Sequence, residues 1–588
     1  MEGTAIGLRA GPDEDMSLRG RCLPLYLFVV ACVLAASCSQ AGSTGSGTTS
    51  AVDRIPTGQL PDIDVNALLA DTRRLSSDEF QGRLPGTPGE ELAVNYLVDR
   101  FREIGLKPGN SNGTYIQKVP LVGITPAPGP LVFKKGAQEQ RLKWKDQFVA
   151  WTKHMTPAAG LKNSELVFVG YGVVAPEFDW DDYKGLDLKG KTLLMLVNDP
   201  PVPDPSNDRE LDPKVFGGKA MTYYGRWTYK YEIAALKGAA GALIVHETEP
   251  AGYPFSVLQS SNVGEKFDLL TPDENKGRAA VEGWIPVDQA KALFELAGLD
   301  FDALKKLAAT RAFKPVPLGV TASISIRNTL RLVDSRNVLA RFEGSDPARR
   351  DELVIYTAHW DHLGKGARGI FHGAEDDALG CAALLELARA YTKLPVPPRR
   401  SILFLAVTAE EQGLLGSEYY SLQPVYPLAR TLADINLDSW NVHGRTRDMT
   451  IVGYGFSDLD GYVRDAAGEQ GRLVHGDAEP EKGFYYRSDH FNLAKQGVPA
   501  ISLQSGSNTD YIGRPAGYAD RVHAEWTEHR YHQPSDVVTP DWDLSGARED
   551  LKVALAVGYR VAQADRFPEW HPGTEFRATR DRQLGRSR

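Results

Sequence analysis

The chain carries the run Ser401-Ile-Leu-Phe-Leu-Ala-Val407, closely followed by Ala409-Glu-Glu-Gln-Gly413. Six consecutive apolar residues, Ile402 to Val407, are typical of a strand that is buried on both faces of a parallel sheet. In open α/β sheets, ligands bind beyond the carboxyl ends of the strands. The adjacent carboxylates that follow this strand therefore belong either to a functional site or to an ordinary solvated turn. The residues that follow the other predicted strands distinguish between these two interpretations.

The sequence around this run alternates between strand and helix patterns. We expect helices at 65–75, 90–104 and 378–391 and strands at 353–357, 402–407, 433–437 and 500–503. Such alternation predicts an α/β fold with a mostly parallel central sheet that is flanked by helices.

A block at residues 123–330 differs in character, because strand-like runs dominate it. It also holds a long polar segment, 199–226, and loops of that length are usually functional or disordered. We therefore expect an inserted strand-rich α/β domain at 123–330, between two parts of the main domain at 60–122 and 331–568. The arginine-rich end, 569–588, is predicted to be a disordered tail.

Bulk composition limits the classes of function. A chain of 588 residues is long for a single hydrophobic core, so two or more domains are expected. A content of 42% hydrophobic and 24% charged residues is typical of a globular protein. A net charge of −9 makes nucleic acid an unsuitable partner.

The N-terminus has the pattern of an export signal. The apolar segment 23–36 follows Arg19 and Arg21, so we expect residues 1–37 to be a signal peptide, with Met16 as an alternative start to Met1. Leu34-Ala-Ala-Ser-Cys38 resembles the lipobox of bacterial lipoproteins, which implies a lipid anchor at Cys38 and a flexible tether over 38–59. The expected location is the periplasmic side of a bacterial membrane, and plain secretion or a soluble periplasmic protein is the alternative.

Other predicted strands also end in polar residues. His359 and Asp361 follow the strand at 353–357, and Asp438 follows the strand at 433–437. The pair Asp376-Asp377 precedes the helix at 378–391, and His532 lies in a later loop. Histidine and carboxylate ligands without thiolates suit a catalytic cation, most commonly zinc.

The number of these residues exceeds what one metal needs. A two-metal site about 3.5–4 Å across is therefore predicted, with one carboxylate left free to move protons. The adjacent Glu410 and Glu411 are candidates for these different roles of base and ligand. Asp361 is placed to accept the second ring N–H of His359, as partners of metal-bound histidines commonly do.

The order of five motifs resembles the M28 family of co-catalytic zinc peptidases. The motifs are His359-Trp-Asp361, Ala374-Glu-Asp-Asp-Ala378, Ala409-Glu-Glu-Gln-Gly413, Asn436-Leu-Asp438 and Tyr531-His-Gln-Pro534. The resemblance covers about 60–125 and 330–565, and the block at 123–330 resembles the protease-associated (PA) domain that many members carry as an insertion. It implies a zinc exopeptidase-like fold, two Zn²⁺ per chain and peptide substrates, with an aminopeptidase as the leading activity.

The resemblance also implies roles for single residues. Asp376 would bridge the metals, while His359 with Asp438 and Glu411 with His532 would complete the two sites. Glu410 would be the general base, Asp361 would support His359, and Tyr531 would match a tyrosine that stabilises the oxyanion in some members. A cis peptide bond is expected between Asp376 and Asp377. Other histidines, including His362, are expected mostly to be local hydrogen-bonding residues.

Several related activities stay open. An arginine-lined pocket would favour a carboxypeptidase-like member, and Arg487 and Arg514 leave that alternative open. A dipeptidase-like member of the same fold is a further alternative. A glutaminyl cyclase-like enzyme typically uses a single zinc, and a receptor-like relative would have lost the metals. The complete set of five ligands argues against the cyclase, and the intact Glu410 and Glu411 argue against the receptor-like relative.

Overall fold

The computed structural model describes residues 54–262, 264–438 and 440–586. The expected signal peptide, Cys38 and most of the tether lie outside the described residues. The tether predicted to extend to residue 59 ends earlier, because Thr57 is buried and its N–H and hydroxyl donate to Glu469 at 2.7 and 2.8 Å. Among the described residues, no helix is long and apolar enough to cross a membrane.

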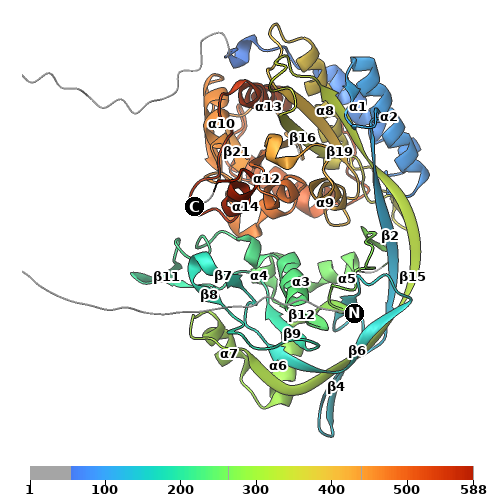
Figure 1. The fold of residues 1–588 in the computed structure, drawn as a ribbon, viewed down its shortest axis with the longest axis vertical. Coiled ribbons are helices and arrows are strands. Elements are labelled where there is room, and N and C mark those ends of the chain that lie inside the picture. Colours follow the sequence, from blue (N-terminus) through green and yellow to red (C-terminus); the bar gives the residue numbers. More distant parts are fainter. Residues whose placement is uncertain (1–53, 263, 439, 587–588) are drawn as a thin grey trace, which may run out of the picture. The chain divides into compact units, whose positions relative to one another are not determined.

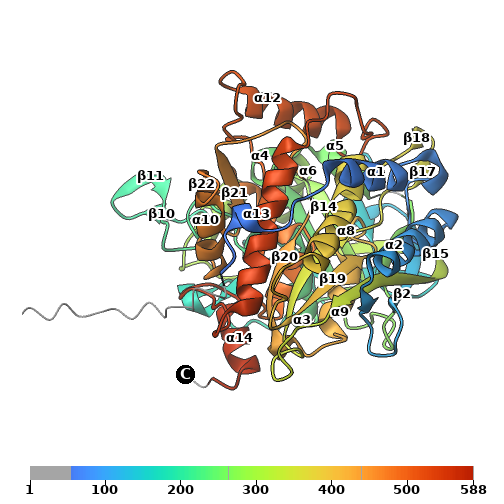
Figure 2. The same cartoon turned by 90° about the horizontal axis from the view of Figure 1, so that it is seen from above.

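The central sheet has four parallel strands with an antiparallel neighbour on each side, which confirms the mostly parallel arrangement. In spatial order the strands are β15 (Val316–Phe342), β19 (Ser401–Val407), β16 (Leu353–His359), β20 (Thr431–Asn436), β23 (Ala500–Gln504), β21 (Asp448–Val452) and β22 (Leu473–Gly476). The main flanking helices are α1 (Val65–Leu75), α2 (Pro88–Ile104), α8 (Leu379–Thr392), α9 (Leu415–Leu422), α10 (Leu459–Gly468), α11 (His490–Lys495) and α13 (Ser545–Gln563). Figure 2 shows α8 and α13 beside the strands that they cover.

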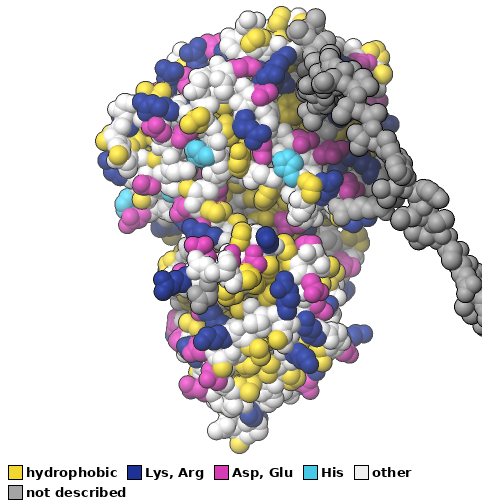
Figure 3. Space-filling view, turned by 90° about the vertical axis from the view of Figure 1, so that its left-hand side faces the viewer, with side chains coloured by type: hydrophobic (Ala, Val, Ile, Leu, Met, Phe, Trp, Pro, Cys, Tyr) yellow, Lys and Arg dark blue, Asp and Glu magenta, His cyan; other side chains and the backbone are white. Residues whose placement is uncertain are grey.

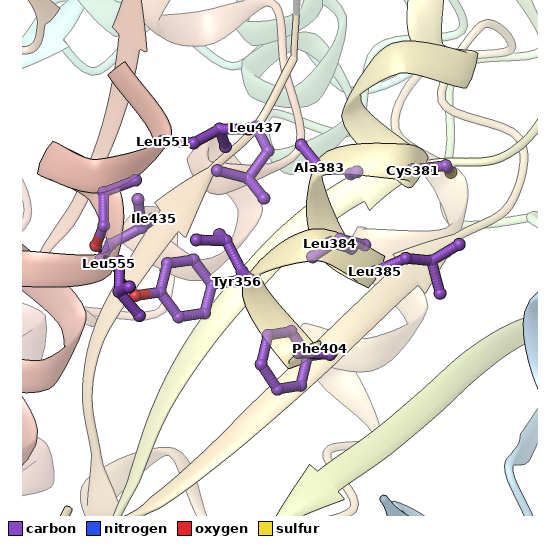
Figure 4. Packing of buried hydrophobic residues seen from close by; sticks show 14 of the residues in the cluster. Tyr356, Cys381, Ala383, Leu384, Leu385, Phe404, Ile435, Leu437, Leu551 and Leu555 are labelled. Atoms are coloured by element: carbon purple, nitrogen blue, oxygen red, sulfur yellow. Dashed lines mark hydrogen bonds between the residues drawn. The ribbon is translucent and has the colours of Figure 1, made fainter. Parts of the chain in front are cut away.

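Both faces of this sheet are buried, which explains the uninterrupted apolar strands. Tyr356 and Phe404 stack at a centroid distance of 5.7 Å on the face covered by α8 and α13 (Figure 4). The alternate residues Ile355 and Leu403 pack on the opposite face with Tyr420 of α9. Because successive strand residues point to opposite faces, a strand covered by helices on both sides needs apolar residues throughout.

The inserted block is joined to the sheet by a two-stranded ribbon. Strand β2 (Ile116–Pro128) pairs with β15 along its whole length, and Gly123 lies opposite Arg331 in this ladder. Figure 1 shows the two strands running together between the parts of the chain. The expected boundaries at 123 and 330 therefore fall inside continuous strands rather than in linkers.

The insert has its own apolar core and a small parallel sheet. Strand β12 (Gly241–His246) lies between β9 (Thr192–Leu196) and β14 (Val281–Pro286), with α3 (Trp227–Leu236) and α6 (Val287–Ala297) packed nearby. The segment 199–226 is more ordered than the sequence predicted. It contains the hairpin β10 (Pro203–Asp204) and β11 (Asn207–Leu211), and the Asp199 carboxylate accepts hydrogen bonds from Thr222 N and Oγ1 at 2.7 and 2.8 Å.

The predicted disordered tail at 569–588 is wrong for its described part. Trp570 is buried and donates to Gly497 O at 2.9 Å, and a helix, α14 (Arg577–Gln583), follows it. Arg580 is buried and donates to the carbonyls of Leu428 and Thr431 at 3.0 and 2.7 Å. Composition indicated a solvated tail, but an arginine can be buried when carbonyl oxygens satisfy its donors.

Charges are mixed on the face drawn in Figure 3. Basic and acidic side chains are scattered over this face, with no broad area of one sign. That face therefore lacks the stripe of lysine and arginine that nucleic acids need.

Candidate metal centre

The parallel strands bring their polar ends to one edge of the sheet. His359 ends β16 and pairs with Val407 at the end of β19, just before Glu410 and Glu411. Asp438 follows β20, the other parallel neighbour of β16. Because these strands are in register, residues far apart in the sequence meet here.

Asp376 lies at the centre of the candidate ligands. Its Oδ1 is 3.2 Å from His359 Nε2, and its Oδ2 is 3.3 Å from His532 Nε2. Donor atoms of His359, Asp376 and Asp438 all lie within 4.8 Å of one another. His532 Nε2 is also 3.0 Å from Glu411 Oε2. All five predicted ligands therefore meet, with one oxygen of Asp376 directed to each imidazole.

A third imidazole, His362, belongs to the same cluster. Its ring is fully buried, and donor atoms of His362, Asp376 and Glu411 form a second group within 4.8 Å. Nδ1 is 2.6 Å from Glu411 Oε1, although the ring is not oriented for a well-directed hydrogen bond, and neither ring nitrogen has a hydrogen-bond partner among the described residues. The expectation of an ordinary hydrogen-bonding histidine is wrong here. The signal was present in the sequence, because His362 continues the strand-end motif one residue after Asp361.

The donor set fits a bound cation. Asp376, Glu411 and the imidazole of His359 are almost fully buried. Burying several carboxylates together costs free energy unless a positive charge compensates them. Imidazoles and carboxylates are typical zinc ligands. The unpartnered nitrogens of His362 point to the same conclusion.

A tight turn over Ala374–Ala378 presents Asp376. The Asp376–Asp377 peptide bond is cis, as expected. Asp536 accepts the N–H groups of Glu375 and Asp376 at 3.0 and 3.2 Å, which fixes the turn.

Asp377 ties this turn to the strand and to helix α8. Its carboxylate accepts His359 N at 3.1 Å and Gly380 N at 2.9 Å. A Cβ at Gly380 would lie 2.0 Å from the carbonyl oxygen of Leu437, so only glycine allows this approach.

Arg83 holds the loops beneath the centre together, and sequence reasoning did not find it. This side chain is fully buried. Its guanidinium donates to four main-chain oxygens at 2.6–2.9 Å, those of Leu75, Trp360, His372 and Gly373. Arginine is suited to this place because its five N–H donors can satisfy several carbonyls at once.

Asp361 contacts His359 through its main-chain oxygen, and not through its carboxylate as the sequence predicted. His359 Nδ1 is 3.1 Å from the main-chain oxygen of Asp361 and 3.8 Å from its carboxylate. The carboxylate instead accepts the Glu410 N–H at 3.0 Å. Burial raises the pKa of Asp361 to about 7. Asp361 thus orients His359 through its carbonyl and Glu410 through its side chain.

The adjacent glutamates have opposite electrostatic environments. Burial raises the pKa of Glu410 well above its usual value, although the nearby His359 opposes this shift. Burial also acts to raise the pKa of Glu411, but the imidazoles of His532 and His362 outweigh it and hold that pKa at about 2. Neighbouring titratable groups with such divergent pKa values typically take different roles, one in proton transfer and one as a fixed charge.

Tyr531 lies beside the centre. Its ring stacks on His532 with centroids 3.8 Å apart and an interplanar angle of 25°. Burial raises the pKa of its hydroxyl, so the group stays protonated and can donate a hydrogen bond near neutral pH.

Comparison with known proteins identifies the family. The sequence model of Peptidase family M28 matches residues 337–556. A protein described as "Probable zinc metalloprotease" from Pyrenophora tritici-repentis is 35% identical over 368 residues, which cover 55% of this chain and 69% of that protein. The chain therefore belongs to peptidase family M28.

Other comparisons cover a shorter part of the chain or have low sequence identity. Aminopeptidase NAALADL1 of Mus musculus is 38% identical over 127 residues, which are 21% of this chain and only 16% of that protein. The solved structure of an aminopeptidase from Aneurinibacillus sp. strain AM-1 covers 86% of this chain and 95% of its own, with 20% identity and a TM-score of 0.46.

Proposed function

We propose that this protein is a two-zinc aminopeptidase that releases N-terminal residues from peptides. The observation that carries the proposal is the pair Glu410 and Glu411, whose pKa values diverge beside a buried cluster of metal-ligand candidates. Membership of a peptidase family and the similarity to aminopeptidase NAALADL1 support it.

The candidate ligands would hold two zinc ions. Asp376 would bridge the ions, His359 and Asp438 would complete one site, and Glu411 and His532 would complete the other. Ser488 donates to Asp438 Oδ2 at 2.6 Å and would orient that carboxylate. When bound, such ions activate water and polarise the carbonyl of the bond that is cleaved.

The side chains then carry out the proton transfers. Glu410 accepts the proton of the attacking water on its carboxylate and passes it to the leaving amine, and its raised pKa suits this exchange near neutral pH. The Tyr531 hydroxyl donates a hydrogen bond to the carbonyl oxygen as negative charge develops there. Asp361 keeps Glu410 in place by accepting its N–H.

The rest of the chain suits an exported enzyme. We assign the insert at 123–330 as a PA domain, because it is a strand-rich α/β unit with its own core that interrupts the peptidase part. Residues 1–37 would be the signal peptide, and Cys38 would anchor the protein at the periplasmic side of a bacterial membrane. Its substrates would be peptides in that compartment.

The test compares peptides that differ only at their N-terminus. Zinc-loaded protein is incubated with free and N-acetylated versions of the same peptides, and products are identified by mass spectrometry. Loss of the N-terminal residue from the free peptides alone is expected. Cleavage of the acetylated peptides from their C-terminus would contradict an aminopeptidase and favour a carboxypeptidase.

A further inference from the structure

The middle of strand β15 has one open edge. On this edge, β6 (Ala158–Phe168) pairs with β15 up to Arg327, and β19 pairs with it from Val338 onward. On the opposite edge, β2 pairs with β15 from Ile326 to Val338. Among the described strands, β2 is therefore the only partner of residues 329–337. Figure 1 shows this part of β15 on the outer side of β2.

Prolines in β2 reveal which main-chain groups of β15 point to the open edge. Opposite residues of an antiparallel ladder alternate between pairs that exchange N–H···O bonds and pairs that do not. Pro120 lies opposite Asp334 and Pro126 lies opposite Asn328, and proline has no N–H to exchange. The carbonyl of Pro120 instead accepts Leu270 N at 2.9 Å, on the side away from β15. The even-numbered residues of β15 therefore direct their N–H and carbonyl groups away from β2.

The open edge is closed at both ends by groups that fit this alternation. Asn328 N donates to Pro157 O at 2.9 Å, and Arg336 O accepts a hydrogen bond from Trp360 Nε1 at 2.9 Å. Between these ends, three residues direct main-chain groups outward to which no described residue bonds: Leu330, Leu332 and Asp334.

The edge also lacks the features that commonly prevent strand pairing. Edge strands of natural proteins are often protected by lysine, proline or a bulge. Residues 329–334, Thr-Leu-Arg-Leu-Val-Asp, contain neither lysine nor proline, and the register with β2 runs through them without a shift. Leu330 and Leu332 are 36% and 72% exposed. Arg331 lies on the other face of the strand, where its guanidinium donates to Glu265 at 2.9 and 2.7 Å.

The edge is complementary to itself in one register. When two copies pair antiparallel about a two-fold axis at Leu332, the two Leu332 residues lie opposite each other, and Leu330 lies opposite Asp334 of the other copy. Because all three are even-numbered, each outward N–H meets an outward carbonyl. Arg331 then lies opposite Val333. An axis at Arg331 would instead place two guanidinium groups opposite each other, which is unfavourable.

We propose that this protein forms a two-fold dimer in which the open edges of β15 pair antiparallel through residues 330–334. Main-chain hydrogen bonds supply affinity, as in other cases of strand addition. Leu330 and Leu332 of the two copies lie on one face and cover each other as cross-strand neighbours. The paired segment is short, so we expect a dimer that dissociates on dilution. The proposal does not depend on the peptidase activity.

The first experiment measures the sedimentation velocity of the purified protein over a series of concentrations. The wild type should show a monomer–dimer equilibrium. Leu332→Lys places two ammonium groups opposite each other at the axis, so the dissociation constant of the dimer should rise more than about tenfold. The matched control is Leu236→Lys, at a leucine of α3 that is 82% exposed, and it should leave the equilibrium unchanged. Urea denaturation checks that both variants are as stable as the wild type.

The second experiment uses a disulfide to test the register. In the proposed pairing, the Cα atoms of the two Leu332 residues are about 5.5 Å apart, which lies within the range that a disulfide spans. Leu332→Cys treated with oxidised glutathione should therefore form a covalent dimer on a non-reducing gel. Leu236→Cys should show only the background that the native cysteines give in the wild type.

A wild type that stays monomeric over the whole series would overturn the proposal, and a peptide or another protein would then be the partner that fits this edge. Equal dissociation constants for Leu332→Lys and the wild type would overturn it as well. A dimer that Leu332→Cys cross-links no better than Leu236→Cys would show that the copies meet through another surface. These measurements need no turnover, so failure of the proposed activity and failure of the dimer are distinguishable.

Discussion

The carboxyl edge of the sheet and the facing part of the insert supply opposite charges. The sheet edge contributes buried carboxylates and imidazoles from strands in fixed register, including His359, Asp376 and Glu411. The insert contributes Arg226, and also Lys266, whose pKa is lowered by burial against the opposing charge of Glu411. The sheet edge therefore supplies the candidate metal ligands and the proposed base, whereas the facing part of the insert adds basic side chains.

The largest effect is expected at a ligand on the sheet edge. Glu411→Gln keeps the shape of the side chain but removes the charge that sits between His532 and His362. Loss of a residue that only hydrogen-bonds to a metal ligand lowers metal affinity about 10- to 100-fold. Loss of the ligand Glu411 should lower zinc affinity by more than this, and activity should fall with it. Zinc content after dialysis and turnover measure both. A variant that retains its full zinc content would break the assignment of Glu411 to the metal side.

The pH dependence sharpens the contrast between the two glutamates. Glu410 must be ionised to accept a proton, and its pKa is raised, so the active form is lost as pH falls through a value above the ordinary 4.5. Below that pH, kcat/KM should fall about tenfold per pH unit. Glu411, with a pKa of about 2, stays ionised throughout this range. Zinc content measured at the same pH values is the control, and an acidic limb that follows zinc loss would contradict this account.

The stability of the sheet edge is expected to depend on Arg83. Arg83→Met leaves four buried carbonyl oxygens without their donor, so the free energy of unfolding should fall by about 3–5 kcal/mol. Urea denaturation measures the change. Arg73→Met, at an exposed position of α1, is the control and should change stability by less than about 0.5 kcal/mol. Equal effects of the two variants would show that Arg83 does not hold these loops.

A smaller effect is expected at His362. His362→Gln removes the contact with Glu411 Oε1, and zinc affinity should fall about 10- to 100-fold. Competition with a chromogenic chelator measures this affinity, with His529→Gln, an exposed histidine, as the control. Unchanged affinity would remove His362 from the centre.

The sequence predicted most of the sheet edge because its signals are local. A continuous apolar run marked β19 as a doubly buried strand, and the alternation of strand and helix patterns marked β16 and β20. The polar residues that follow these three strands marked the site. The structure brings those residues together as the topology requires. The site residues at a strand end can be predicted because they directly follow the strand in the sequence.

The remaining features depend on contacts between distant residues. Tyr223 of the insert and Tyr486 of the peptidase part are far apart in the sequence, yet their ring centroids lie 6.1 Å apart. The carbonyl of Asp361, rather than its carboxylate, meets His359 because the carboxylate binds the Glu410 N–H. No spacing rule indicates such arrangements, which depend on tertiary packing.

The central claim is that two adjacent glutamates divide proton transfer from metal binding. Glu410→Gln tests it most directly, with zinc content and turnover measured on one preparation. Zinc content should stay full while turnover falls about 10²- to 10⁴-fold, because only the proton acceptor is lost. Retained turnover, or loss of zinc together with activity, would contradict it.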